Sequence, residues 1–254
     1  MAYALLGDHL SHSLSVPVHR EICEKRGLPF DYVLREIPRE NFSRGIRGIL
    51  REYDGVNITI PYKRDVIPFL DELSPEAEAT GAVNTIVRTG EKLIGYNTDI
   101  RGFQVLMETA RISADIPCWI LGTGGAASAV RYAVRDLDCQ EIRTVSRDAA
   151  RGEPYSVLKD GFSGLLVNCT PVGMYPRADE CPLSEDALQT ILPRARAVID
   201  LIYNPEKTRL LSAAAAAGVK AVNGLTMLYA QAEASEELWA AARGSGAGAW
   251  NQVR

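Results

Sequence analysis

Short apolar runs alternate with helical patterns of apolar residues along the chain. An apolar run of roughly four to eight residues is typical of a buried strand, whereas apolar residues at every third or fourth position are typical of a helix. We therefore expect strands at residues 2–6, 32–37, 55–60, 82–88, 92–96, 116–121, 141–145, 165–169, 197–201 and 219–222. We expect helices at residues 15–26, 39–51, 65–70, from 74, 98–112, 126–137, 149–158, 204–217 and 225–242. This alternation predicts an α/β fold with largely parallel sheets.

One stretch, Trp119 to Ser128, joins an apolar run to a helical pattern through three glycines. Gly122, Gly124 and Ala127 match G-x-G-x-x-G/A. In that motif the first glycine permits a tight turn, the second lets the backbone approach a pyrophosphate, and the small third residue packs the helix on its strand. The amide groups at the helix N-terminus then face an anion. The alternative is an ordinary strand-to-helix turn, but the strand–turn–helix context favours a dinucleotide site.

Composition excludes several classes of protein. The chain has 254 residues, 46% hydrophobic and 24% charged, with a net charge of -4. It shows no basic stripe and no apolar run of membrane-spanning length, so we expect neither nucleic acid nor a membrane as a partner. A strand near residue 3 also argues against a signal peptide. The five scattered cysteines predict reduced thiols and a cytoplasmic protein. Three histidines (His9, His12 and His19) lack supporting ligands, so we predict no metal.

Short polar side chains gather in the first half of the chain. Ser13 and Ser15 lie in a loop after the first strand, where ligands bind in open α/β sheets. Asn57 and Thr59 alternate on one face of an apolar strand, and Lys63 follows the proline that ends it. Two further segments, 81–85 and 95–99, add asparagine–threonine pairs and an aspartate. Helix caps, a solvated lysine and turn residues are the structural alternatives.

These motifs together resemble those of the shikimate dehydrogenases, with the quinate/shikimate dehydrogenases beside them. The resemblance covers nearly the whole chain. It includes Ser13 and Ser15, 57–63, 81–85, 95–99, the glycine loop, 168–174, 200–205, and 224–227 with Gln231. The chain departs from the usual pattern at Val16, Ile100 and Thr226, and it is short around residues 151–163.

The resemblance implies a role for each matching residue. Lys63 and Asp99 match the catalytic pair of the family. Positions that hold the hydroxyls and carboxylate of shikimate match Ser13, Ser15, Thr59, Asn84, Tyr203 and Gln231. Positions around the nicotinamide cofactor match Gly122, Thr123, Gly124, Gly125, Ala126, Ala127, Ser146, Arg147, Arg151, Thr170, Gly224 and Met227. The lysine would exchange the proton of the reacting hydroxyl, and the aspartate would orient the lysine.

The choice between NAD and NADP depends on the residues that follow the strand expected at 141–145, the first strand after the glycine loop. An NAD site would place an acidic residue there, about 20 residues after the glycines. This chain instead has Ser146 and Arg147, with Arg151 one helical turn later. Two guanidinium groups suit the 2′-phosphate of NADP, although Asp148 lies between them and would repel it. We therefore expect NADP rather than NAD; the alternative is that both arginines are solvated surface charges.

The sequence thus predicts two α/β domains with the active site in the cleft between them. Residues 1–100, completed by a C-terminal helix at 224–254, would bind substrate, and residues 101–223 would form a Rossmann-like NADP-binding domain. The resemblance implies reversible, NADPH-dependent reduction of 3-dehydroshikimate to shikimate on the route to chorismate and the aromatic amino acids. A quinate/shikimate dehydrogenase and a catalytically weak cofactor-binding sensor are the rival readings. We expect a monomer or homodimer.

Overall fold

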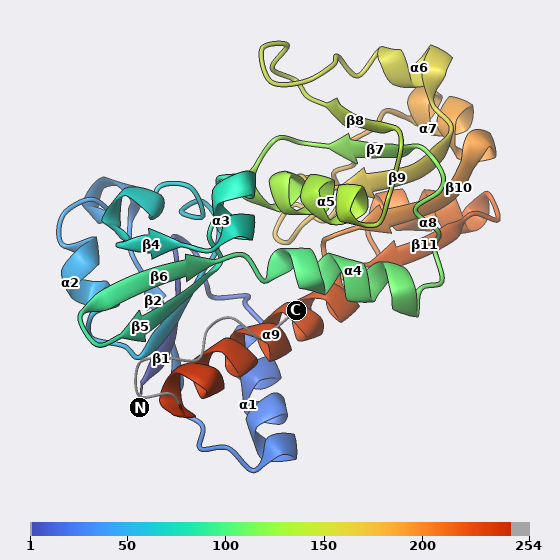
Figure 1. The fold of residues 1–254 in the computed structure, drawn as a ribbon. Helices are drawn as coiled ribbons and strands as arrows, with labels where there is room; N and C mark the ends of the chain where they lie inside the picture. The colour runs from blue at the N-terminus through green and yellow to red at the C-terminus, as the bar shows by residue number, and fades with distance from the viewer. Residues whose placement is uncertain (1, 245–254) are drawn as a thin grey trace. The chain divides into compact units, whose positions relative to one another are not determined.

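The computed structural model describes residues 2–244, so most of the predicted glycine-rich tail (244–248) lies outside the described residues. The described chain forms two compact units. The first unit contains the segments Met1–Thr98 and Gln231–Arg254, and the second contains Asp99–Ala230. The second boundary falls within one helix, α9 (Leu225–Gly244). Figure 1 shows the elements of both units.

The first unit is built on a six-stranded mixed sheet of order β2-β1-β3-β5-β6-β4. β5 pairs antiparallel with both β3 and β6, and the other pairs are parallel. β5 and β6 correspond to the strands expected at 82–88 and 92–96, and they form a hairpin. Its strands are β1 (Tyr3–Gly7), β2 (Tyr32–Glu36), β3 (Gly55–Ile58), β4 (Glu72–Leu73), β5 (Thr85–Thr89) and β6 (Lys92–Tyr96). Its helices are α1 (Ser15–Arg26), α2 (Ile46–Leu50), α3 (Pro75–Thr80) and the 3₁₀ turns Arg39–Asn41 and Ile67–Phe69.

Each face of this sheet has its own apolar core. On one face, Leu6, Val56 and Ile58 pack with residues of α2 and of the loops around it. On the other, Tyr3, Leu5 and Val87 pack against the indole of Trp239 from α9 and against Val16 from α1. The Trp239 indole donates to the carbonyl of Ile86 (3.0 Å), which fixes α9 on the sheet.

The second unit is a five-stranded, all-parallel sheet of order β11-β10-β9-β7-β8. Its strands are β7 (Cys118–Leu121), β8 (Ile142–Val145), β9 (Gly164–Asn168), β10 (Ala195–Asp200) and β11 (Lys220–Asn223). Its helices are α4 (Asp99–Thr109), α5 (Gly125–Asp136), α6 (Val157–Gly161), α7 (Glu185–Ile191), α8 (Arg209–Ala216), the 3₁₀ turn Leu192–Arg194 and the start of α9. α4 and α5 cover one face and α6, α7 and α8 the other (Figure 1), which is a doubly wound arrangement.

Several predicted helix boundaries were wrong, each for a local reason. The helix expected at 39–51 is broken because Gly45 adopts φ +96°, which leaves a 3₁₀ turn at Arg39–Asn41 and the short helix α2. The helix expected at 149–158 begins later, because the backbone returns to the sheet edge and Glu153 bridges to Val145. The helix expected from residue 204 begins at Arg209, where the Thr208 side chain caps it. Likewise, Ser15 is the first residue of α1 rather than its cap.

Candidate active site

The predicted cofactor residues of the second unit lie at the carboxyl ends of its parallel strands. Ligands of open α/β sheets bind at this edge. The glycine loop follows β7, Ser146 follows β8, Thr170 follows β9 and Gly224 follows β11. The structure therefore brings together residues that are up to 102 positions apart, from Gly122 to Gly224, at one edge of one sheet.

The glycine loop turns the chain from β7 into α5. Gly122 adopts φ +105°, a conformation that favours glycine, and its amide donates to the carbonyl of Val145 (2.9 Å). Gly124 is the N-cap of α5, and a Cβ built on it would meet nothing within 4 Å. Ala127 is buried in the core between α5 and the strands. The turn therefore offers open space in front of the first amides of a 12-residue helix, which fits a diphosphate.

The segment after β8 presents two exposed guanidinium groups. Ser146 is buried, and its hydroxyl accepts from the amide of Asp148 (3.0 Å). Arg147 and Arg151 are both exposed. The carboxylate of Asp148, which the sequence placed between them as a source of repulsion, accepts from the amide of Ala150 (3.0 Å). This carboxylate therefore stabilises the local turn, but its negative charge would still repel a phosphate.

A buried hydrogen-bond network supports the loop that holds Thr170. The amide and hydroxyl of Thr170 both donate to Asn168 Oδ1, at 3.0 and 2.7 Å. Asn168 Nδ2 donates in turn to Asp200 Oδ1 (2.9 Å), and the hydroxyl of Thr208 donates to Asp200 Oδ2 (2.7 Å). Burial raises the pKa of Asp200 to about 6, against the opposing effect of these donors. The Asp200 carboxyl therefore organises the ends of two neighbouring strands.

Three further predicted site residues of this unit differ in their burial and contacts. A Cβ on Gly224 would overlap the carbonyl oxygen of Leu201, so glycine is needed here for the approach of two backbones. Met227 is buried in the core beneath α4 and α5. Tyr203, which we matched to substrate binding, is half-buried just beyond β10.

The predicted substrate residues of the first unit follow β1 and β3 and flank the β5–β6 hairpin. The hydroxyl of Ser13 donates to that of Ser15 (3.1 Å). The backbone amide of Thr59 donates a hydrogen bond to the carbonyl of Leu6 (2.9 Å). Lys63 lies in the turn beyond Pro61, where its carbonyl accepts from the amide of Val83 (2.7 Å). Because β5 runs antiparallel to β3, the start of β5 meets the end of β3 at this edge.

Asn84 directly precedes β5 and is only 2% exposed. Its Oδ1 accepts from the amide of Thr98 (2.7 Å), and its Nδ2 donates to Thr98 Oγ1 (2.9 Å) and Gln231 Oε1 (3.3 Å). Two predicted substrate residues, 147 positions apart, are thereby in contact. Asn97 is different, because its amide donates to Thr80 and Ala82 and closes a turn.

The predicted catalytic residues belong to different compact units. Lys63 is half-buried in the first unit, and Asp99 is the first residue of α4 in the second, with 4% of its surface exposed. Their catalytic roles, and the binding roles of the residues above, stay predictions.

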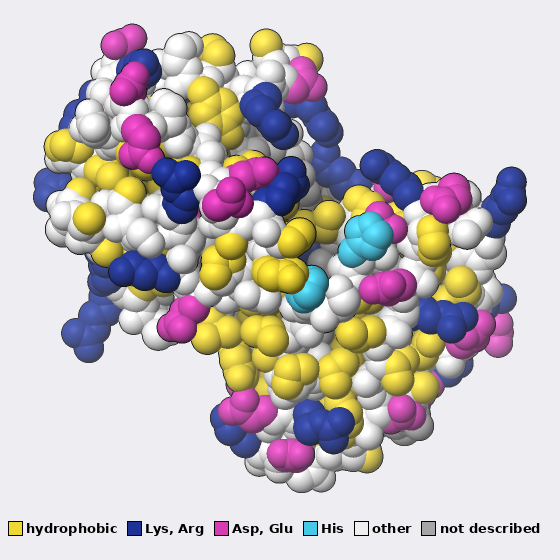
Figure 2. Space-filling model, turned by 180° about the vertical axis from the view of Figure 1, so that it is seen from behind, with side chains coloured by type: hydrophobic (Ala, Val, Ile, Leu, Met, Phe, Trp, Pro, Cys, Tyr) yellow, Lys and Arg dark blue, Asp and Glu magenta, His cyan; other side chains and the backbone are white. Residues whose placement is uncertain are grey.

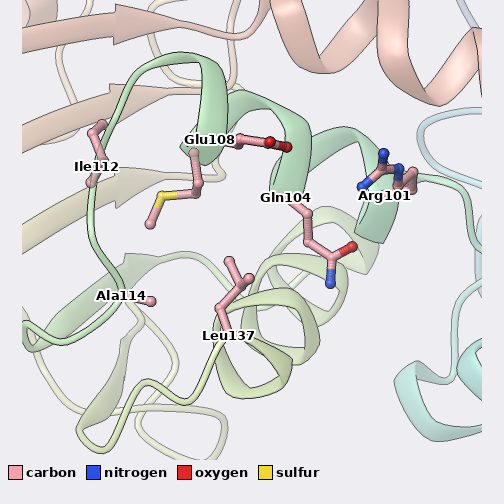
Figure 3. A pocket seen from close by; sticks show the side chains of 7 residues that line it. Arg101, Gln104, Glu108, Ile112, Ala114 and Leu137 are labelled. Atoms are coloured by element: carbon pink, nitrogen blue, oxygen red, sulfur yellow. The ribbon is translucent and has the colours of Figure 1, made fainter.

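Other features of the described chain lie away from these residues. Within residues 2–244, no three His, Cys, Asp or Glu side chains gather as metal ligands would, and no helix is long and apolar enough to cross a membrane. On the face seen in Figure 2, acidic and basic side chains are interspersed. A hollow of about 400 Å³ on the second unit (Figure 3) is lined by Arg101, Gln104, Met107, Glu108, Ile112, Ala114 and Leu137.

Comparison with known proteins matches almost the whole chain to one family. Residues 5–86 match the model of the shikimate dehydrogenase substrate binding domain. A shikimate dehydrogenase (NADP(+)) of Clostridium beijerinckii is 38% identical over 249 residues, covering 93% of this chain and 91% of the relative. The chain belongs to the shikimate dehydrogenase family.

Solved structures of shikimate dehydrogenases agree with this result and confirm the predicted two-domain α/β fold. Shikimate dehydrogenase 1 from Peptoclostridium difficile superposes with a TM-score of 0.88 at 35% identity, covering 95% of this chain and 92% of that one. A shikimate 5-dehydrogenase from Thermus thermophilus, in complex with NADP(H) and shikimate, gives a TM-score of 0.85 at 32% identity, covering 95% and 94%.

Two departures from the usual shikimate dehydrogenase motifs are packing residues in this structure. Val16 packs against the core between α1 and the first sheet. Ile100, directly after Asp99, is 6% exposed and belongs to the core of the second unit. Each side chain therefore contributes apolar contact area to the core of its own unit.

Sequence reasoning missed Ser235, which supports the site residues, whereas Thr85 belongs to an asparagine–threonine pair that the sequence had indicated. Ser235 and Thr85 are fully buried and hydrogen-bonded to Asn57 (3.0 and 3.1 Å). The only signal in the sequence was a serine one helical turn after Gln231, on the same face of the expected helix.

Proposed function

We propose that this protein catalyses the reversible, NADPH-dependent reduction of 3-dehydroshikimate to shikimate, a step of chorismate and aromatic amino acid biosynthesis. The observation that carries the proposal is the match, over nearly the whole chain, to a shikimate 5-dehydrogenase in complex with NADP(H) and shikimate.

The carboxyl edge of the second sheet fits the cofactor. The open turn at Gly124 and the first amides of α5 would hold its diphosphate, and Arg147 and Arg151 would hold its 2′-phosphate. Ser146 would support this turn through its bond with the amide of Asp148. The nicotinamide, when bound, supplies or accepts the hydride.

The polar edge of the first unit fits a small acid with several hydroxyls. Ser13, Ser15, Thr59 and Asn84 offer short polar groups, and Gln231 offers an amide. Lys63 would give a proton to the carbonyl oxygen during reduction and take it back during oxidation. Its ammonium would also stabilise negative charge on that oxygen. Asp99 would orient this ammonium, and we propose that Tyr203 contributes to substrate binding.

Turnover assays test the function directly. We expect the protein to oxidise shikimate with NADP⁺, and assays with quinate and with NAD⁺ separate this activity from a broader quinate/shikimate dehydrogenase. A sensor would bind cofactor without significant turnover of either acid.

Replacement of the catalytic lysine tests the mechanism. Lys63→Ala should lower kcat by about 10²–10⁴, the usual contribution of a positioned acid or base, with a much smaller change in the KM for shikimate. Lys92→Ala, at an exposed lysine of the same unit that pairs with Glu72, is the matched control and should keep normal activity. A folded Lys63→Ala enzyme with near-normal kcat would rule out this role.

Asp99→Ala should impair the same step. Because the two residues would act as a unit, the double variant should lose less than the two single losses combined. If the losses in activation free energy of the two single variants added up fully in the double variant, the two residues would act independently.

We further propose a cytoplasmic monomer or homodimer. Five cysteines of this chain are free thiols, which a reducing compartment preserves.

A further inference from the structure

The hydroxyl of Ser235 lies at the centre of a buried polar cluster in the first unit. Ser235 is on α9, one helical turn after Gln231, and has no exposed surface. Its Oγ lies 3.0 Å from Asn57 Nδ2, 2.8 Å from Thr85 Oγ1 and 3.3 Å from Thr98 Oγ1. It also lies 2.9 Å from the backbone carbonyl of Gln231. One hydroxyl therefore joins α9 to β3, β5 and the residue before α4.

The bonding capacity of a hydroxyl fixes the direction of these contacts. Ser235 has one proton, and the Gln231 carbonyl can only accept, so the proton goes there. The two lone pairs of Ser235 must then accept, one from the amide of Asn57 and one from the hydroxyl of Thr85. Because the proton of Thr85 is used in this way, its oxygen is left as an acceptor for Thr98 (3.0 Å) or for Asn57 (3.1 Å).

The network continues through the hydroxyl of Thr98, which accepts from Asn84 Nδ2 (2.9 Å), to the candidate substrate residues. Asn84 Oδ1 accepts from the amide of Thr98, so its Nδ2 must be the group that faces Gln231 Oε1. With its oxygen turned to Asn84, Gln231 presents its N–H groups to any other neighbour. An N–H donor suits a carboxylate or hydroxyl oxygen of an acid such as shikimate.

We infer that Ser235 is a positioning residue for substrate recognition. Through Thr85 and Thr98 it supports the orientation of Asn84, whose Nδ2 donates to Gln231 Oε1, and it bonds to the backbone carbonyl of Gln231 on α9. This inference rests on the proposed function, because shikimate is the ligand whose binding it governs. A serine that only bonds back to the carbonyl four residues earlier would be a helix-internal feature; the contacts to Asn57 and Thr85 distinguish Ser235 from that case.

Ser235→Ala tests the inference by steady-state kinetics. Removal of the hydroxyl leaves Asn57 and Thr85 with one partner fewer, so the hydroxyl of Thr85 can turn to Asn84 Oδ1, 3.3 Å away. We expect the KM for shikimate to rise about 10-fold, with kcat changed less than about 2-fold and the KM for NADP⁺ unchanged. Ser212→Ala is the matched control, because Ser212 makes the same type of bond to the carbonyl of Thr208 on α8. It should leave all three constants unchanged.

A double variant tests whether Ser235 acts through Gln231. If it does, Ser235→Ala introduced into Gln231→Ala should change the KM for shikimate less than about 2-fold. An equal rise in the KM for shikimate when Ser235→Ala is introduced into the wild type and into Gln231→Ala would overturn the inference. So would a Ser235→Ala enzyme that melts at a lower temperature but keeps its KM for shikimate, since the hydroxyl would then serve stability alone.

Calorimetric titration of the wild type with shikimate separates this inference from the proposed function. If the wild type neither binds nor oxidises shikimate, the proposed function fails, and this inference fails with it. If the wild type does both and Ser235→Ala behaves like it, only the inference fails.

Discussion

The buried carboxyl of Asp200 predicts a pH dependence of stability that a single substitution can reveal. Asp200 has no exposed surface, and burial raises its pKa from 3.8 to about 6. Below pH 3.8 the group is protonated in both the folded and the unfolded chain. As the pH rises through 3.8 toward 6, the unfolded chain loses this proton more readily than the folded one. The group therefore contributes stability at low pH that is lost as the pH rises through about 6.

The difference of about 2.2 between these pKa values corresponds to about 3 kcal/mol, at 1.36 kcal/mol for each pKa unit. Asp200→Asn removes the titration but keeps most of the contacts. The amide oxygen can still accept from Asn168 and from the amide of Ile202, and the hydroxyl of Thr208 can accept rather than donate. The stability of the variant relative to the wild type should therefore rise by about 2.5 kcal/mol between pH 4 and pH 7.5.

Urea unfolding of both proteins across this pH range measures that difference, and titrations common to both cancel. Hydrogen exchange of amides in β9 and β10 localises the effect to the second unit, which matters because two units need not unfold together. Asp115→Asn, at an exposed loop position, controls for the loss of one carboxylate. A stability difference that stays constant or falls with pH would refute the reasoning.

Three further substitutions test other parts of the structure. Arg147→Ala should raise the KM for NADP⁺ by about 10- to 150-fold and leave that for NAD⁺ unchanged; equal weakening of both would remove Arg147 from the 2′-phosphate site. His19→Leu should destabilise the protein by about 3–5 kcal/mol in thermal or urea unfolding, because it leaves the carboxylate of Glu236 buried without its 2.8 Å partner. Adding Glu236→Leu should restore most of that loss, and a double variant as unstable as the single one would contradict this account. Gly55→Ala should cost about 1–3 kcal/mol, because the new Cβ would overlap the indole of Trp239; unchanged urea unfolding would show that the indole can move.

Sequence reasoning found the elements whose signals are local. The glycine turn between β7 and α5 is one, because an apolar run, a glycine with positive φ and a helical pattern are adjacent in the chain. α7 was missed although Ser184 and two acidic residues mark its start, because the prolines nearby favour a loop. Element boundaries failed where one backbone conformation, such as that of Gly45, overrides a periodic pattern.

The supporting contacts of the site could not be predicted in the same way. Ser235 bonds to Asn57 across 178 positions and to Thr85 across 150, and no local pattern encodes such pairs. The role of Asn97 was equally hidden, because a turn asparagine and a ligand asparagine have the same sequence signal until their partners are known. Family resemblance supplied candidate roles for the site residues, but only the fold identifies the residues that hold them.

The first unit is built from two segments that are far apart in the sequence, so during synthesis it cannot finish folding until the second segment has been made. Residues up to Thr98 leave the ribosome first, yet Trp239, which covers Tyr3 and bonds to Ile86 153 positions earlier, is made near the end. At about 5–20 residues per second, this face of the sheet stays uncovered for roughly 8–30 s during synthesis. The aromatic and aliphatic side chains that it exposes would promote aggregation in that interval. Chains that terminate before α9 should therefore depend on chaperones or be degraded, even though every strand of the first sheet is already present.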